Sequence, residues 1–227
     1  QSVGDDFTLT DLPVTSKQMI MGNFDRWVTD PDITFDSVKT FLADEKNNGA
    51  LYRGKYIMAT TSGSTGFPLI FAIDKTSRDV YCAESILLKI FRHRPICMLY
   101  PTKMPLIAVS LFKENLIRFP FIRKSMHLID VMLPTAQLVE QLNRIQPKTL
   151  YAYPSTMEIL ADECLSGRLR INVKEVICAS EMLTPKAKAY IEEVFQCKAR
   201  SIYGCTEGGN IAYTCSEGWN WQISNKS

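Results

Sequence analysis

Strand-like and helix-like segments alternate through most of this chain, and this alternation limits its fold more than any other feature. Short apolar runs with the pattern of strands span residues 95–100, 125–133, 149–153, 173–179, 199–203 and 211–215. Segments with the pattern of helices lie between them, at residues 77–91, 104–119, 135–145, 155–165 and 185–195. Short connections between such elements are typical of a mainly parallel sheet covered by helices on both faces. We therefore predict an α/β fold with a mainly parallel sheet layered with helices.

Capping residues mark the starts of several predicted helices. Thr135 and Ser155 are the predicted N-caps of two helices, and Thr184 precedes Pro185, which suits a first helical position. Two further helices are predicted before residue 50. Thr15 or Ser16 would cap the first, whose apolar side chains share one side: Met19, Ile20, Phe24 and Trp27. The second spans residues 34–44, with three side chains facing inward: Phe35, Val38 and Phe41.

Charge, hydropathy and cysteine usage exclude several classes of function. A net charge of +2 over 227 residues is too small to indicate a nucleic acid or an anionic membrane as partner. The longest apolar run, residues 105–112, is far shorter than the roughly 20 residues that span a bilayer. The seven cysteines are scattered and form no Cys-x-x-Cys pair. They indicate a reduced protein, which we expect in the cytoplasm, and they give little support for a zinc site.

Residues 60–68, with the sequence Thr-Thr-Ser-Gly-Ser-Thr-Gly-Phe-Pro, form a polar loop between two apolar flanks. The flanks at residues 56–59 and 69–73 predict a strand on each side. Two glycines allow the backbone N–H groups to converge, and adjacent hydroxyls add donors, which suits the oxygens of a nucleotide triphosphate. The Gly-Lys-Ser/Thr of a Walker A motif is missing. From the loop alone, a flexible hairpin connection stays open as the alternative.

Polar and aromatic residues follow three of the predicted strands. The segments are Tyr153-Pro154-Ser155, then Ser180-Glu181, then residues 203–207. Ligands bind beyond the carboxyl ends of the strands in open parallel sheets. We therefore expect all three segments to open onto one cleft.

The polar loop and the third of these segments resemble motifs of the adenylate-forming enzymes, which include acyl-CoA synthetases, peptide-synthetase adenylation domains and luciferases. Residues 61–68 resemble the phosphate loop of that superfamily, and Tyr-Gly-Cys-Thr-Glu at residues 203–207 resembles its Tyr-Gly-x-Thr-Glu motif. Residues 179–185, Ala-Ser-Glu-Met-Leu-Thr-Pro, resemble the segment that forms the adenine floor. With residues 152–155 and 194–197, this segment is similar to the phenylacetate–coenzyme A ligase branch.

The resemblance implies ATP-dependent activation of an organic carboxylic acid, aryl in this branch, to an acyl-adenylate, followed by transfer to coenzyme A. It implies ATP, Mg²⁺ and coenzyme A as cofactors and a small carboxylic acid as partner, without nucleic acid or membrane, and it allows a homodimer. Alignment and charge neutralisation would drive this chemistry, since it needs no strong base.

The resemblance also assigns roles to site residues. Thr206 would hydrogen-bond the α-phosphate, and Glu207 would carry Mg²⁺, a hard ion that prefers oxygen ligands. Tyr203 would stack on adenine, with Ser180 and Glu181 at its edge. The remaining residues implied in nucleotide binding are Thr61, Ser62, Gly63, Ser64, Thr65, Gly66 and Gly204, and those implied beside the acyl group are Tyr153, Pro154, Ser155 and Cys205.

The chain departs from the plan of the superfamily in two ways. Phe67 and Leu69 stand where many relatives carry a lysine, so we expect a weaker hold on the triphosphate. The ribose-binding aspartate and the lysine of the mobile C-terminal domain have no counterpart up to Ser227. We therefore expect residues 1–227 to be a truncated, N-terminal AMP-binding domain that turns over poorly alone.

Other interpretations stay open at this stage. A degenerate relative would bind an aryl acid or a nucleotide without chemistry, and Tyr203 and Glu207 would then be a core aromatic and a surface turn. A phosphate-loop NTPase is disfavoured because Gly-Lys-Ser/Thr is missing. His93 and His127 lack the neighbours of a Ser-His-Asp triad. A zinc role for Cys205 and Cys215 rests only on their nearness to the motif.

Overall fold

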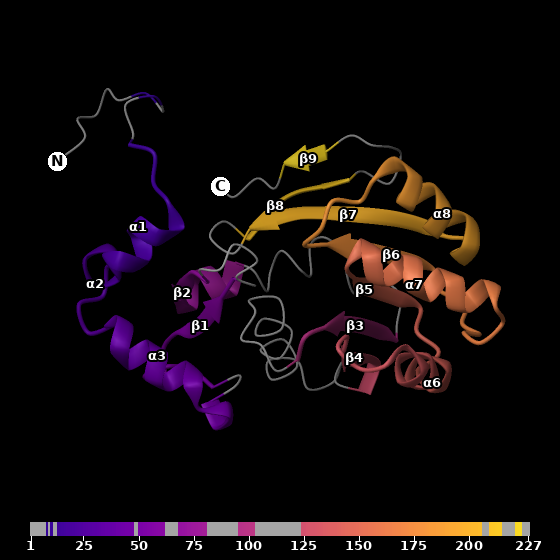
Figure 1. The fold of residues 1–227 in the computed structure, drawn as a ribbon, viewed down its shortest axis with the longest axis horizontal. Coiled ribbons are helices and arrows are strands. Elements are labelled where there is room, and N and C mark those ends of the chain that lie inside the picture. The colour runs from indigo at the N-terminus through magenta and orange to yellow at the C-terminus, as the bar shows by residue number, and fades with distance from the viewer. Residues whose placement is uncertain are drawn as a thin grey trace.

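A seven-stranded sheet forms the larger part of the protein, and a two-stranded hairpin lies apart from it (Figure 1). The coordinates are a computed structural model that describes residues 8, 10, 13–47, 50–61, 68–80, 95–102, 124–205, 209–214 and 221–223.

The large sheet has the strand order β4-β3-β5-β6-β7-β8-β9. Its strands are β3 (Ile96–Tyr100), β4 (Met126–Asp130), β5 (Thr149–Ala152), β6 (Glu175–Ala179), β7 (Lys198–Cys205), β8 (Gly209–Thr214) and β9 (Trp221–Ile223). The pairings from β4 across to β7 are all parallel, and β8 and β9 continue the sheet antiparallel. The predicted α/β fold with a mainly parallel sheet is confirmed.

One face of this sheet is covered by three helices, α6 (Thr135–Ile145), α7 (Pro154–Leu165) and α8 (Pro185–Phe195). The core between them buries apolar side chains of the helices, such as Leu142, Leu160 and Ile191, against alternate strand residues, such as Leu150 and Val176. The predicted helices at residues 77–91 and 104–119 fall mostly outside the described residues, and residues 75–80 are helical.

Two predicted helix caps are wrong. Pro154 occupies the first turn of α7, so this helix begins before Ser155, and Tyr153 stands at the N-cap. Thr135 is likewise the first residue of α6 rather than its cap, since Pro134 precedes the helix without a side-chain cap. In both cases the fixed φ of proline starts the helix earlier than the hydroxyl residue suggested. Thr184 is confirmed as the N-cap of α8, because its hydroxyl accepts the Ala187 N–H.

The N-terminal part consists of short helices and a hairpin. Its elements are α1 (Lys17–Gly22), α2 (Phe24–Trp27), α3 (Phe35–Ala43), the 3₁₀ turn η2 (Glu45–Asn47), β1 (Ile57–Thr60) and β2 (Ile70–Ile73). The single helix predicted from residue 16 to residue 27 is interrupted at Asn23, whose carboxamide donates to the Met19 carbonyl. The predicted hairpin is confirmed by antiparallel pairing of β1 with β2. A small core joins the helices to the hairpin through Phe24, Ile33, Val38, Tyr52, Met58 and Ile70.

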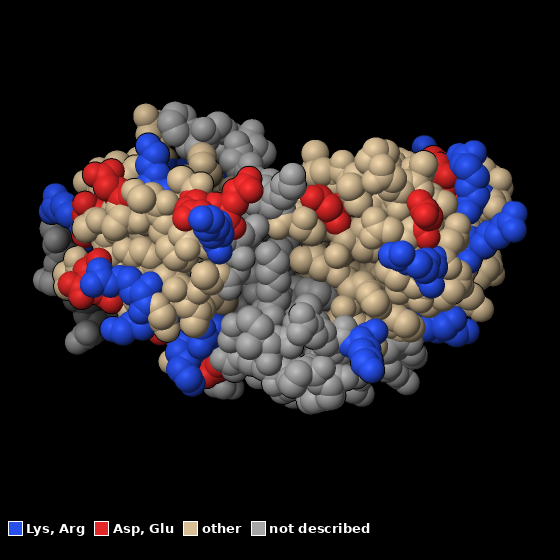
Figure 2. Space-filling view, turned by 90° about the horizontal axis from the view of Figure 1, so that it is seen from below, with Lys and Arg blue, Asp and Glu red and all other residues tan. Residues whose placement is uncertain are grey.

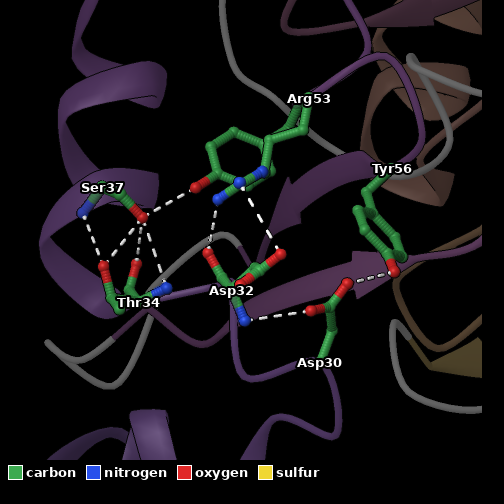
Figure 3. Close-up of polar contacts among 7 residues, drawn as sticks. Asp30, Asp32, Thr34, Ser37, Arg53 and Tyr56 are labelled. Carbon is green, nitrogen blue, oxygen red and sulfur yellow. Dashed lines mark hydrogen bonds and ion pairs between the residues drawn. The ribbon is translucent and has the colours of Figure 1, made fainter.

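A polar cluster fixes the turn before α3 against the entry to the hairpin (Figure 3). The Tyr56 hydroxyl donates to Asp30 Oδ2 at 2.6 Å, and the Asp32 N–H donates to Asp30 Oδ1 at 3.0 Å. Arg53 donates from a guanidinium nitrogen to the Asp32 carbonyl at 2.7 Å. The hydrogen bond from Tyr56, followed by that from Asp32, lowers the pKa of Asp30 below its ordinary 3.8.

The Asp30–Tyr56 bond predicts a pH-dependent contribution to stability. A carboxyl whose folded pKa is depressed adds stability above its unfolded pKa and loses it as the pH falls through the folded pKa. Tyr56→Phe should therefore lower the free energy of unfolding at pH 6, and the gap from the wild type should shrink as the pH falls below 3.8. Urea unfolding of both proteins from pH 2.5 to pH 6 would measure the gap. A gap that stays constant over this range would show that the Asp30 charge is not involved.

The core of α7 predicts a large difference between two leucines of one helix. Leu160 is fully buried, whereas Leu165 is 67% exposed. Leu160→Ala should lower the free energy of unfolding by about 2–5 kcal/mol, because it leaves a cavity. Leu165→Ala, the matched control, should change it by about 0.5 kcal/mol or less. Denaturant unfolding measures both, and equal losses would contradict the placement of α7.

Candidate functional site

The predicted phosphate loop is closed at its base by Thr61 and Leu69. The Thr61 N–H donates to the Leu69 carbonyl at 3.0 Å, and the Thr61 hydroxyl accepts the Leu69 N–H at the same distance. These bonds extend the β1–β2 pairing by one step, so that Thr61 holds the two ends of the loop together. The loop residues proper, Ser62, Gly63, Ser64, Thr65 and Gly66, lie outside the described residues, as does Phe67.

The other predicted segments lie at one edge of the large sheet. Tyr153, Ser180 and Tyr203 follow or end β5, β6 and β7, which are neighbouring parallel strands whose carboxyl ends lie at the same edge. In Figure 1 the arrowhead of β7 points toward the half of the molecule that holds β1 and β2. The structure thus places Tyr153, Ser180 and residues 203–205 at one edge of the sheet, as the strand pattern predicted, whereas residues 206 and 207 lie outside the described part of the chain.

Ser180 and Glu181 form a sharp turn directly after β6. Ser180 has a φ of +68°, a left-handed conformation that costs a residue with a side chain roughly 1–2 kcal/mol. Both residues are exposed. The Glu181 carboxylate accepts the Ser155 N–H at 3.2 Å, and this N–H belongs to the first turn of α7, where it has no partner within the helix. Glu181 therefore supplies the cap that Ser155 was predicted to give.

Three tyrosines gather beside this turn. The ring of Tyr100, the last residue of β3, lies 4.7 Å from the ring of Tyr153 and 5.8 Å from that of Tyr151. The hydroxyls of Tyr100 and Ser180 are hydrogen-bonded at 3.1 Å. Burial raises the pKa of Tyr151 to about 12 and that of Tyr100 well above its ordinary value, and burial, then the charge of Glu181, raises that of Tyr153. All three hydroxyls are therefore protonated at neutral pH.

Tyr203, Gly204 and Cys205 end β7 and are exposed. Tyr203 has 57% of its surface exposed, which does not agree with a core aromatic. The register of β7 against β8 shifts between Tyr203 and Gly204, an irregularity of the kind that re-aims side chains at the end of a strand. Thr206 and Glu207, the predicted catalytic pair, lie outside the described residues, so their roles stay predictions.

Sequence reasoning missed Tyr100 and Tyr151. Tyr100 ends a fully buried strand, and Tyr151 lies within β5 two residues before Tyr153. The signal for Tyr100 was its place, because the last residue of a parallel strand lies at the edge where ligands bind. The pairing with Ser180, 80 residues away, has no local signature.

The described residues bear on metal ligands, membrane-spanning helices and surface charge. Within them, no three His, Cys, Asp or Glu side chains are grouped so that they could hold a metal ion. Helices that are both long and apolar enough to span a membrane are also absent from this part of the chain. On the face shown in Figure 2, basic and acidic side chains are interspersed. His127 lies in β4, where burial lowers its pKa.

Solved structures share the fold of this chain, whereas no family model and no curated protein matches it. A 2-hydroxyisobutyryl-CoA ligase in complex with 2-HIB-AMP and CoA has a TM-score of 0.56 and 19% identity, over 73% of this chain and 37% of that one. The luciferase-like enzyme from the mealworm Zophobas morio gives 0.55 and 14%, over 69% and 36%. McyG A-PCP complexed with phenylalanyl-adenylate gives 0.54 and 14%, over 69% and 26%.

These similarities show a shared fold. At 14–19% identity they carry no residue-by-residue assignment. The chain spans between about a quarter and somewhat over a third of the length of these three structures.

The base of the predicted phosphate loop allows the effect of two substitutions to be predicted. Thr61→Val keeps the shape of the side chain but removes the acceptor of the Leu69 N–H, and Leu69 is only 2% exposed. We expect a loss of about 1–3 kcal/mol in the free energy of unfolding, because a buried donor is left unpaired. Thr61→Ser, which keeps the hydroxyl, is the control and should lose less. If both variants match the wild type in urea unfolding, the loop is closed by other contacts.

Proposed function

We propose that this chain is the nucleotide-binding part of an enzyme that activates a small carboxylic acid with ATP and transfers the acyl group to coenzyme A. The observation that carries the proposal is the convergence of Tyr153, Ser180 and Tyr203 at one edge of a sheet whose fold is shared with CoA ligases. The residue roles rest on the sequence motifs and on this placement.

The proposed chemistry joins a carboxylate oxygen to the α-phosphorus of ATP and releases pyrophosphate. Ser62 to Gly66 would hold the outer phosphates through backbone N–H groups and hydroxyls, and Thr206 would donate to the α-phosphate. Mg²⁺ on Glu207 would neutralise phosphate charge during the transfer. The adenine would lie against Tyr203, whose side chain is 57% exposed, with Ser180 and Glu181 at its edge.

We further propose that the acid is of aryl type. Tyr153 is half-buried at the carboxyl end of β5, and its ring packs on Tyr100, so an aromatic wall stands beside the turn at Ser180. Aromatic walls favour flat apolar ligands through offset or edge contacts. The chain alone should turn over slowly, since none of its assigned residues is a lysine that would contact the reacting carboxylate.

Exchange of radiolabelled pyrophosphate into ATP tests the proposal, because it detects slow adenylate formation. The assay would use the chain with Mg-ATP and, in turn, phenylacetate, benzoate and 2-hydroxyisobutyrate. We expect exchange that depends on the acid and is strongest with an aryl acid. Glu207→Gln should reduce the exchange rate on the order of a hundredfold. Glu193→Gln, an exposed carboxylate near the end of α8, is the matched control and should leave it unchanged.

Two results would contradict the proposal. Release of ADP and phosphate, in place of AMP and pyrophosphate, would indicate a nucleotide hydrolase. Calorimetric binding of an aryl acid that does not respond to Mg-ATP, without any exchange, would indicate a binding module that has lost its chemistry.

A further inference from the structure

Tyr100 touches both segments that the proposed function assigns to ligands. Its side chain is 1% exposed at the end of β3. Its ring packs on Tyr153, in the acyl segment, and its hydroxyl bonds to Ser180, in the adenine segment. Because β3, β5 and β6 are neighbours in the sheet, Tyr100 reaches across β5 to the turn after β6.

The contacts around Tyr100 form a closed ring. From Tyr100 they pass to Ser180, and the next residue, Glu181, accepts the N–H of Ser155. Ser155 lies in the first turn of α7, directly after its N-cap residue Tyr153 and Pro154. The side chain of Tyr153 packs on Tyr100, which closes the series of contacts. A shift of the turn after β6 therefore moves the start of α7, and the reverse also holds.

The left-handed backbone of Ser180 makes the position of this turn depend strongly on a single hydrogen bond. A serine at a φ of +68° is strained and persists only where its surroundings hold it. Ser180 is exposed, and the contact that the structure gives its side chain is the Tyr100 hydroxyl. Without that hydroxyl, the turn and the carboxylate of Glu181 have fewer constraints.

We propose that Tyr100 is a positioning residue that couples the acyl pocket to the adenine pocket. The inference rests on the proposed function for the identity of the two ligands, and on the contacts alone for the coupling. Coupling of this kind is reciprocal: an occupied acyl pocket tightens nucleotide binding by the same factor by which nucleotide tightens acid binding. If Tyr100 only filled the core, its ring alone would matter, and removal of its hydroxyl would leave the mutual effect of the two ligands unchanged.

Tyr100→Phe keeps the ring on Tyr153 but removes the hydroxyl, which bonds to Ser180 and also interacts with the Tyr151 hydroxyl, so it is compared with Ser180→Ala, which removes the Ser180 bond alone. Amide hydrogen exchange of the ligand-free protein is the first readout. We expect the Ser155 amide and residues 180–183 to exchange about three- to tenfold faster, the size of one neutral hydrogen bond. Calorimetry with AMP and with phenylacetate is the second. AMP affinity should fall by a similar factor, and the factor by which phenylacetate tightens AMP binding in the wild type should fall toward one.

Two further variants sharpen the test. Tyr190→Phe is the matched control, since it removes a tyrosine hydroxyl bond to Asp162 between α7 and α8, away from the site. It should leave exchange at Ser155 and AMP affinity unchanged. Ser180→Ala removes the hydrogen bond between Tyr100 and Ser180 by changing the exposed partner, so the core is left as it is. The double variant of Tyr100 and Ser180 should then be no worse than either single variant.

The outcomes decide the two proposals separately. If the wild type binds neither AMP nor ATP, the proposed function fails, and hydrogen exchange still decides the positioning role. If Tyr100→Phe leaves exchange at Ser155 unchanged, or if the effects of the two substitutions simply add, the positioning role is overturned. If phenylacetate tightens AMP binding by the same factor in Tyr100→Phe as in the wild type, Tyr100 acts as core packing and the coupling is refuted.

Discussion

The protein depends on the alignment of parallel strands whose carboxyl ends meet at one edge. From β4 to β7 the strands run in the same direction, so the residues that follow β5 and β6 emerge beside one another, together with the end of β7. The core beneath α6, α7 and α8 holds this alignment by burial of apolar side chains such as Leu150, Val176 and Ile191. At this edge Ser180, Glu181 and Tyr203 are exposed, whereas Tyr100 is 1% exposed.

Different turns of α7 contribute to the core and to the candidate site. Its middle turns bury Met157 and Leu160 in the core, whereas its first turn takes its cap from Glu181, a residue of the candidate site. The strained turn at Ser180 is held by Tyr100 and stands next to that cap. Strain held in place by well-packed surroundings is a common property of ligand sites.

Local patterns predicted the elements of the fold, but not the contacts between distant ones. Alternating apolar runs located β3 to β8 and the hairpin, and Thr184 with Pro185 marked the start of α8. The three-residue β9 is too short for its pattern to be recognised. No pattern predicted the break at Asn23, whose side chain bonds back to Met19, and the predicted hydroxyl cap of α7 was wrong because Glu181 supplies the cap from a distant turn. For the site, strand ends predicted Tyr153, Ser180 and Tyr203, while the motif residues Ser62 to Gly66, Thr206 and Glu207 remain predictions.

The central claim is that two segments about 140 residues apart hold opposite ends of one nucleotide. Photolabelling with two azido analogues of ATP, one substituted on the adenine and one on the γ-phosphate, tests it directly when the labelled peptides are identified by mass spectrometry. The account predicts that the adenine probe labels peptides containing Ser180 or Tyr203, and that the γ-phosphate probe labels the peptide with residues 61–68. Both probes on one segment, or labels confined to other peptides, would contradict it.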